Sequence, residues 1–286
     1  MESDRDGLLS PTLFSIFLER IMTDVLEDHG GTASVGGRTN TNLRFADDID
    51  GLAGEEEELA NLVERFNKAS TAHGMDISAE KTKLMTNNTS GIKTVIIVNV
   101  QKLETVTSIK YLDSVITEEG SKPEILSRIA QTTAALTRLK PVWNDRSISL
   151  RSEIRLMRSP VIFVFLYTCE SWTFTTVPQR IIRAMEVRCY RKILRISYKY
   201  HVTNEEVCTP ACNRTTRRPS DHLKRCKLKW YGHVSRSSGL AKTIFHGTVK
   251  KGRRQGRQKK RKEDNIMEWA GLEFSKSQRA VENRDK

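Results

Sequence analysis

The sequence predicts an α+β fold in which short antiparallel strands and helices come first, a mainly helical region follows, and a basic, partly disordered tail ends the chain. Three observations lead to this prediction. Apolar residues recur at helical spacing in four segments, β-branched runs lie between them, and Lys and Arg accumulate toward the end. With 286 residues, 37% of them apolar, the chain can bury a substantial core.

Two helices are predicted in the first quarter of the chain. Residues 11–26 place apolar side chains three and four positions apart, and Pro11 suits a first helical turn. Residues 55–71 form a second amphipathic segment, whose opening glutamates favour the positive end of a helix dipole. Gly74 follows this segment as a C-terminal stop signal.

Two more helices are predicted later. One begins at Ser121, for which Glu124 completes a capping box, and it ends before Pro141. The other spans about residues 178–196 and combines an apolar stripe with a basic surface. The basic residues on this surface are Arg180, Arg183, Arg188, Arg191, Lys192 and Arg195.

Strand signals are shorter than the helix signals. Residues 95–98 and 109–116 are β-rich and predict hairpins that close a sheet. The longest apolar run, residues 161–167, is either a buried strand or a core helix segment. A membrane helix would need about 20 apolar residues, so no membrane partner is expected.

The segment Phe45-Ala46-Asp47-Asp48 carries the most specific chemical signal. Its pattern predicts strand, tight turn and strand, with the Asp pair at the turn. Carboxylate oxygens are hard ligands that suit Mg²⁺, the ion used in phosphoryl and nucleotidyl transfer. Asp also favours turns for its own backbone hydrogen bonding, so the pair alone allows a purely structural interpretation.

Three further segments accompany the Asp pair in a fixed order. Residues 7–14 read Gly-Leu-Leu-Ser-Pro-Thr-Leu-Phe, residues 73–83 read His-Gly-Met-Asp-Ile-Ser-Ala-Glu-Lys-Thr-Lys, and residues 109–116 read Ile-Lys-Tyr-Leu-Asp-Ser-Val-Ile. Together the four segments resemble the palm motifs of the reverse transcriptase of non-LTR (LINE-like) retrotransposons. Residues 229–234 resemble the tail that follows the polymerase in these elements.

The resemblance implies a domain organisation and a function. Residues 1–120 would form a partial palm, residues 121–200 a helical thumb-like region, and residues 201–286 a basic nucleic-acid-binding tail. The function would be RNA-directed DNA polymerisation by two-metal nucleotidyl transfer, with Mg²⁺ or Mn²⁺, on an RNA template and a DNA primer.

The resemblance also assigns roles to single residues. Asp47 and Asp48 are the expected catalytic residues and metal ligands, with Asp47 the stronger candidate for bridging both ions. Lys81 stands at a position that assists the departure of pyrophosphate. Ser10 belongs to the segment that lies under the template and the incoming nucleotide, so it is expected to bind nucleic acid.

The same comparison indicates what the chain lacks. In the family a third catalytic Asp and the basic fingers precede the Ser-Pro segment, which here begins at Ser10. Asp113 replaces the Gly of the family's Tyr-Leu-Gly turn. It places a negative charge in a turn that supports the primer and is expected to be uncharged. We therefore expect a fragment that is inactive alone and that a missing polymerase half or another subunit would complete.

Positive charge is concentrated near the end of the chain. Residues 214–262 hold 18 Lys or Arg and a single acid, so they carry +17 while the whole chain carries +13. This asymmetry predicts a polyanionic partner, with nucleic acid the leading candidate. The alternative function is thus a non-catalytic nucleic-acid-binding remnant, with Trp230 and Tyr231 stacking on unpaired bases. The residues expected to bind are Lys227, Lys229, Trp230, Arg253, Arg254, Arg257, Lys259 and Lys260.

Four residues invite a zinc interpretation. Cys208, Cys212, His222 and Cys226 form C-x3-C-x9-H-x3-C, and four such ligands can close a tetrahedral site. Some non-LTR polymerases carry a Cys-Cys-His-Cys motif after the thumb. The spacing here fits loosely and three intervening arginines add positive charge, so the default expectation is unlinked cysteines without zinc.

The expected location is intracellular, nuclear or cytoplasmic. Five cysteines without framework spacing fit a reducing compartment, and the first residues lack a secretion signal pattern. The run Lys259-Lys260-Arg261-Lys262 would also serve as a nuclear import signal.

Overall fold

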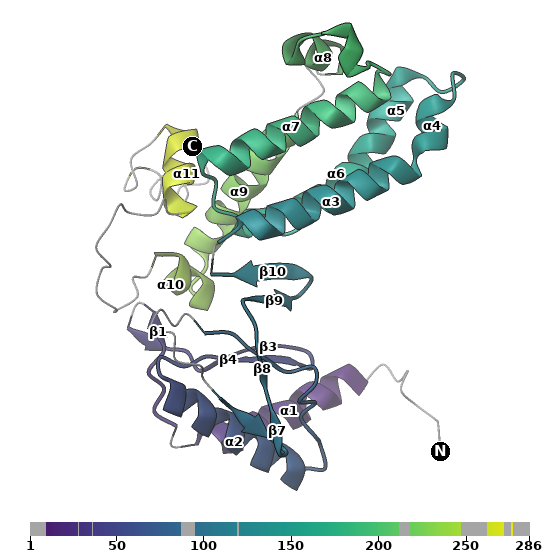
Figure 1. The fold of residues 1–286 in the computed structure, drawn as a ribbon. Coiled ribbons are helices and arrows are strands. Elements are labelled where there is room, and N and C mark those ends of the chain that lie inside the picture. The colour runs from purple at the N-terminus through teal and green to yellow at the C-terminus, as the bar shows by residue number, and fades with distance from the viewer. Residues whose placement is uncertain are drawn as a thin grey trace. The chain divides into compact units, whose positions relative to one another are not determined.

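The structure is a computed structural model that describes residues 10–27, 29–35, 37–86, 95–118, 120–211, 218–246, 262–271 and 276. The described residues form two compact units (Figure 1). The first unit extends to Ile109 and includes residues 239–246, and the second comprises residues 110–238 and those from 262 onward. Helices and small sheets occur together, which confirms the α+β class.

Two long helices organise the first unit. Helices α1 (Ser10–Leu26) and α2 (Glu56–Ala72) pack against each other and bury Ile21, Val25 and Leu62 between them. Both helices lie within one residue of the bounds that apolar spacing predicts. A short helix, α10 (Leu240–His246), also belongs to this unit.

The strands of the first unit are short and pair two by two. They are β1 (Ser34–Val35), β2 (Arg38–Thr39), β3 (Asn42–Phe45), β4 (Asp48–Gly51), β5 (Lys83–Leu84), β6 (Ile97–Val98), β7 (Gln101–Lys102) and β8 (Glu104–Thr105). The pairs β1–β2, β3–β4 and β6–β7 are antiparallel, and β5–β8 is parallel. Within the described residues these pairs do not join into one sheet, since strands of two to four residues offer few ladder hydrogen bonds.

A hairpin and a helical layer make up the second unit. The hairpin consists of β9 (Ser108–Tyr111), which spans the boundary, and β10 (Ser114–Thr117). The helical elements are α3 (Lys122–Arg138), α4 (Lys140–Asn144), α5 (Leu150–Leu156), the π-helical turn η1 (Met157–Val161), α6 (Ile162–Leu166), the 3-10 turn η2 (Cys169–Ser171), α7 (Thr176–Ile193), the 3-10 turn η3 (Tyr198–Tyr200), α8 (Asn204–Ala211), α9 (Pro219–Arg236) and α11 (Lys262–Ala270).

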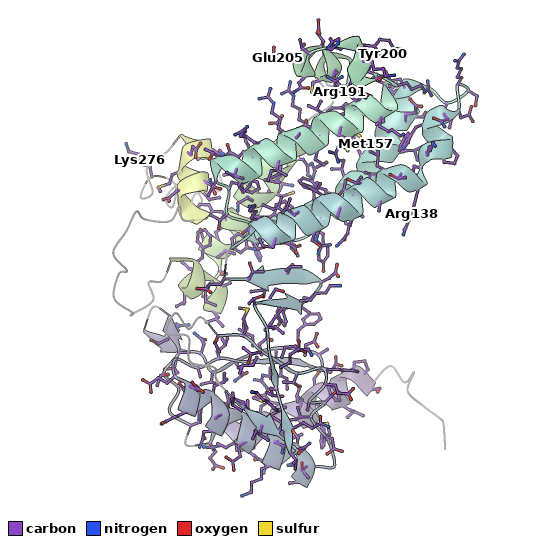
Figure 2. The ribbon with its side chains drawn as sticks, viewed as in Figure 1. Arg138, Met157, Arg191, Tyr200, Glu205 and Lys276 are labelled. Atoms are coloured by element: carbon purple, nitrogen blue, oxygen red, sulfur yellow. The ribbon has the colours of Figure 1, made fainter. Side chains whose placement is uncertain are left out.

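The core of the second unit is rich in large side chains. Trp143, Met157, Phe165 and Tyr190 are fully buried in one cluster to which α3, α6 and α7 contribute. Figure 1 shows α3 and α7 side by side, and Figure 2 shows side chains filling the space between the helices. The apolar run 161–167 is helical, so the helix alternative is confirmed. No helix in the described part of the chain is both long and apolar enough to cross a membrane.

The predicted capping box at the start of α3 is wrong, although the helix does begin there. Ser121 has a helical backbone and its side chain makes no cap hydrogen bond. Its hydroxyl instead accepts a hydrogen bond from the backbone N–H of Thr173 at 2.9 Å. The Glu124 carboxylate accepts from the backbone N–H of Val115 on β10 at 2.6 Å, so both residues serve tertiary contacts in place of the local cap.

A buried ion-pair network joins the hairpin to α3. Arg128 is 3% exposed, donates to Glu124 at 2.7 Å and to the carboxylate of Asp113 at 3.1 Å, and lies 4.6 Å from the ring centroid of Tyr167. Its guanidinium also donates to the carbonyl oxygen of Asp113. Two buried charges are thereby paired and hydrogen-bonded, the condition under which burial of charge is tolerated.

We predict that Arg128→Met destabilises the second unit by about 3–5 kcal/mol, because the variant leaves the Glu124 carboxylate buried without its cation. All four tryptophans, Trp143, Trp172, Trp230 and Trp269, lie in this unit, so tryptophan fluorescence during urea unfolding reports on it. Arg138→Met, at an exposed position of the same helix (Figure 2), is the control and should change stability by less than about 0.5 kcal/mol. Equal midpoints for the two variants would contradict the network's role.

Candidate active site at the β3–β4 hairpin

The Asp pair lies at the tip of a regular antiparallel hairpin. Phe45 pairs with Asp48, which leaves Ala46 and Asp47 as a two-residue turn. The predicted strand-turn-strand is therefore present, with Asp47 in the turn and Asp48 as the first residue of β4. Both Asp side chains are exposed.

One face of this hairpin is directed toward the helices. Arg44 reaches Glu19 on α1, with 2.6 Å between guanidinium and carboxylate. A Cβ added to Gly51 would lie 3.4 Å from Leu62 of α2, so the strand approaches that helix closely. The face that carries Arg44, Ile49 and Gly51 is thus the one that contacts the helices, α1 through the Arg44–Glu19 ion pair and α2 through the strand β4.

Because side chains alternate along a strand, the opposite face carries Asp48 and Asp50. Their cross-strand partners on this face are Phe45, which is 60% exposed, and Leu43. Burial raises the pKa of Asp50, and the nearby Asp48 carboxylate raises it further. Asp48 and Asp50 are two residues apart on the same face of β4, so their carboxylates lie near each other. Sequence motifs had not singled out Asp50; the two-residue period of a strand was the signal that could have done so.

The described residues do not complete a compact three-ligand cage at this tip. Three or more His, Cys, Asp or Glu side chains could hold an ion if their ligand atoms all lay within 4.8 Å of one another. Among the described residues such a group occurs in the second unit and not at this tip. Asp47 and Asp48 thus offer carboxylate oxygens of the right kind for Mg²⁺ or Mn²⁺, without a third ligand closing the site in the described part of the chain.

A buried carboxylate anchors the segments on either side of the hairpin. Glu58 of α2 accepts hydrogen bonds from the backbone N–H of Thr32 at 2.7 Å, from the hydroxyl of Thr32, and from the N–H of Gly54 at 3.1 Å. Burial opposes the ionisation of Glu58, but these donors outweigh it and lower the pKa below its ordinary value. The segment before β1 and the segment after β4 are therefore fixed to the same helix.

The turn itself contains a strained residue. Ala46 has φ of +53°, in the left-handed region that costs a non-glycine residue about 1–2 kcal/mol. Such backbone outliers persist where the surrounding structure determines them, and they cluster at functional sites.

The two other palm residues predicted from the resemblance are exposed. Ser10 is the first residue of α1. Lys81 lies in a turn closed by a hydrogen bond from the N–H of Thr82 to the carbonyl of Ser78 at 2.9 Å. Within the described residues, no hydrogen bond or ion pair links Lys81 to the Asp pair.

The β9–β10 turn explains how an aspartate occupies the expected glycine position. Leu112 and Asp113 both have positive φ, +45° and +64°, a turn geometry in which Gly, Asn and Asp are favoured. The Asp113 carboxylate lies 2.6 Å from the Lys110 ammonium and 3.1 Å from the Arg128 guanidinium. The negative charge of Asp113, which the family's glycine would not carry, is thus paired with two cations.

Comparison with known proteins agrees with this geometry. Residues 7–116 match the family model of reverse transcriptase (RNA-dependent DNA polymerase). The matched reverse transcriptase segment contains the Asp hairpin, Lys81 and nearly all of the β9–β10 hairpin. Reverse transcriptases of this family generally use divalent metal ions.

A transposon-derived protein of Caenorhabditis elegans is 26% identical to this chain over 210 residues, which cover 71% of this chain and 74% of the relative. That similarity is longer than the matched reverse transcriptase segment, so it includes residues outside it. The first finding supports a reverse-transcriptase-like segment in this chain, and the second relates the chain to a protein described as transposon-derived.

The basic residues of α7 and Arg195, two positions beyond its end, divide into two sets. Arg191 donates to the carbonyl of Val202, and Arg195 donates to the carbonyl of Trp143 at 2.7 Å and to Glu153 at 2.9 Å. These two arginines hold the helical layer together. The remaining basic residues, Arg180, Arg183, Arg188 and Lys192, are exposed.

The aromatic-basic block expected to bind nucleic acid is part of helix α9. Lys227 is 1% exposed, and its ammonium donates to the carbonyls of Glu170, at 3.2 Å, and Trp172. Tyr231 is 2% exposed and Trp230 is half-buried, whereas Lys229 is exposed. Burial of Tyr231 excludes the predicted stacking by that ring. Arg253, Arg254, Arg257, Lys259 and Lys260 lie outside the described residues.

The cysteine motif is divided in the structure. Cys208 is buried on α8, which packs against α7, and Cys226 on α9 faces the turn η2. Cys212 lies outside the described residues, and His222 is exposed on α9.

We predict that Ala46→Gly stabilises the first unit by up to about 1 kcal/mol, since glycine removes the left-handed strain at the cost of a more flexible unfolded chain. Ala53→Gly, at a residue without positive φ, should instead destabilise it by about 0.5–1 kcal/mol. Hydrogen exchange of the β3–β4 amides measures both effects. Destabilisation by both glycines would contradict the strained turn.

We predict that Asp113 stabilises the second unit in a pH-dependent way. The Lys110 ammonium and then Arg128 hold the pKa of Asp113 below its ordinary value. A carboxyl with a depressed folded-state pKa contributes stability above its unfolded pKa, and the contribution is lost as pH falls through the folded pKa. Asp113→Asn should therefore cost up to about 1 kcal/mol at pH 7, because the carboxylate is half-exposed. Urea unfolding at pH 7 and pH 2 should show the difference only at pH 7; a difference of equal size at both pH values would contradict this origin.

Proposed function

We propose that the chain is a fragment of an RNA-directed DNA polymerase from a non-LTR retrotransposon, with residues 1–120 as a partial palm and residues 121–200 as a thumb-like region. One observation carries the proposal: two exposed carboxylates, Asp47 and Asp48, stand at the tip of an ordered hairpin inside the segment that matches reverse transcriptase.

In this proposal the hairpin holds divalent metal ions. Asp47 in the turn and Asp48 at the start of β4 would hold Mg²⁺ or Mn²⁺, and a bound ion would supply activation of the primer 3′-hydroxyl and neutralisation of the triphosphate. Arg44 and Gly51 hold the hairpin against α1 and α2, so the tip is positioned by rigid elements. Lys81 would assist the departure of pyrophosphate, as the resemblance to the family implies.

We also propose that this chain does not polymerise alone. Two carboxylates stand at the tip, and the described residues add no third ligand that closes the site there. A partner that supplies a further carboxylate would complete the site.

Primer extension on an RNA template with Mg²⁺ or Mn²⁺ tests this proposal. We expect no extension by the full chain or by the Asp47→Ala, Asp48→Ala double variant, because loss of one ligand of a two-metal site lowers the rate by orders of magnitude. Extension by the unmutated chain, together with its loss in the double variant, would contradict the proposed inactivity. The same result would support Asp47 and Asp48 as the catalytic site.

Nucleic-acid binding without catalysis is the second candidate function. The observation that favours it is the exposed basic set on α7, together with the +17 carried by residues 214–262. Lys and Arg contacts to phosphate release counterions and therefore give affinity that falls steeply with salt.

We predict that RNA binding weakens strongly between 50 and 200 mM salt and survives the double Asp variant. Each lost contact to a single strand lowers the slope of log affinity against log salt by about 0.7. The triple variant Arg180→Gln, Arg183→Gln, Arg188→Gln should therefore reduce the magnitude of this slope by about 2. Fluorescence anisotropy at several salt concentrations measures the slope. RNA binding that does not depend on salt concentration would contradict binding through Lys and Arg contacts to phosphate.

A further inference from the structure

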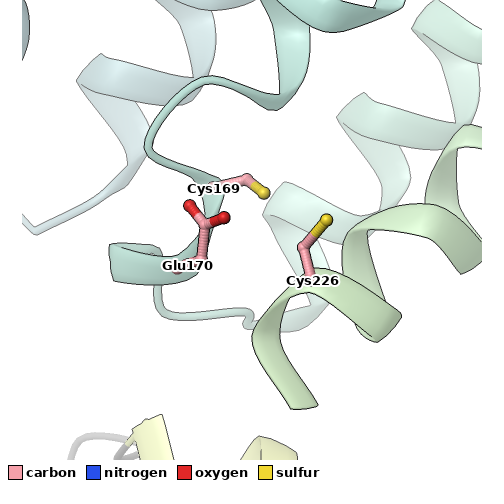
Figure 3. Close-up of side chains that lie close together, drawn as sticks. All are labelled: Cys169, Glu170 and Cys226. Carbon is pink, nitrogen blue, oxygen red and sulfur yellow. The ribbon is translucent and has the colours of Figure 1, made fainter. Parts of the chain in front are cut away.

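Two thiols and a carboxylate meet where the turn η2 packs against helix α9. Cys169 and Glu170 come from the turn and Cys226 from the helix, and their ligand atoms all lie within 4.8 Å of one another. Figure 3 shows the two sulfurs directed toward each other, with the Glu170 carboxylate beside Cys169. From these side chains we propose a zinc site at Cys169, Glu170 and Cys226.

The donor set and its spacing suit zinc. Thiolate sulfur is a soft donor that selects zinc over Mg²⁺ or Ca²⁺, and a carboxylate oxygen is an accepted third ligand. Two sulfurs at about 2.3 Å from a tetrahedral zinc ion lie about 3.8 Å apart. The ligand atoms here are of that order of separation, all within 4.8 Å of one another. Three protein ligands leave a fourth position for water or for another side chain.

The backbone around the site is already fixed. The carbonyl of Cys169 accepts a hydrogen bond from the N–H of Trp172, and Lys227, the neighbour of Cys226, donates to the carbonyl of Glu170 at 3.2 Å. The hydroxyl of Thr168 donates to Glu124 at 3.3 Å. The turn η2 and helix α9, which carry the three ligands, are thus held in place before any ion binds, and this lowers the entropic cost of binding.

Charge balance favours a divalent cation at this position. Zn²⁺ with two thiolates and one carboxylate carries a net charge of −1, and the buried Lys227 ammonium compensates it. Thiolates bind zinc in place of their protons, so zinc affinity should increase with pH.

The burial pattern fits a site at the edge of the core. Cys169 is fully buried, whereas Glu170 and Cys226 are half-buried. The two outer ligands are thus partly accessible to solvent, and the inner sulfur would hold the ion from the core side. The site differs from the zinc motif suggested by sequence spacing, because Cys226 is shared but Cys169 and Glu170 replace Cys208, Cys212 and His222.

Zinc content and Co²⁺ substitution of the full chain under reducing conditions test the site. We expect one zinc per protein and, with Co²⁺, near-ultraviolet absorption from thiolate-to-cobalt charge transfer. Cys226→Ser should weaken zinc binding by about 100-fold and Glu170→Gln by about 10-fold, because each removes a ligand. Unmutated protein without stoichiometric zinc and without the thiolate band would overturn the proposal.

Cys208→Ser is the matched control, since Cys208 is also buried in the second unit and belongs to the alternative motif. The proposed site predicts full zinc content in this variant and loss in Cys169→Ser. Zinc lost in Cys208→Ser and retained in Glu170→Gln would assign the metal to the sequence motif and overturn the site. Glu170 and Cys226 are half-buried, so their variants keep the test decisive if Cys169→Ser fails to fold.

Discussion

The packing of hairpin β3–β4 on helices α1 and α2 is the constraint on which the candidate active site depends. Ile21, Val25 and Leu62 join the two helices, and Gly51 allows β4 to approach Leu62 closely. Because strand side chains alternate, fixing one face on the helices directs Asp48 and Asp50 to the other. The position of the carboxylates is therefore a consequence of apolar packing one layer away from them.

The second unit uses basic residues in its interior. Arg128 and Lys227 are each at most 3% exposed, and each ammonium or guanidinium is bound by carbonyl or carboxylate oxygens of a neighbouring segment. Removing such a cation leaves its partner groups unsatisfied in the core, which is costly. In a chain with a net charge of +13, part of the positive charge thus maintains the fold and is not offered to a polyanion.

Helices were the most predictable part of this fold. Apolar spacing is a local property, and it placed α1 and α2 within one residue of their bounds. The capping box failed because Ser121 and Glu124 bind Thr173 and Val115, partners that local spacing does not reveal.

The candidate site was predicted in part. The Asp pair and its hairpin could be recognised from residues that are adjacent in sequence, and the match to reverse transcriptase agrees with them. The burial of Lys227 and the approach of Cys226 to Cys169 could not be predicted from sequence, because both depend on contacts between residues more than 50 positions apart. Counting basic residues or cysteine spacings does not distinguish a surface side chain from one that is buried by such a contact.

The central claim is that the tip of the β3–β4 hairpin binds divalent metal through Asp47 and Asp48. Paramagnetic broadening of backbone amide NMR signals by Mn²⁺ tests it without requiring catalysis. The account predicts selective broadening of residues 46–50 that is lost in the Asp47→Asn, Asp48→Asn double variant. Broadening that is absent from these residues, or that persists unchanged in the double variant, would contradict it.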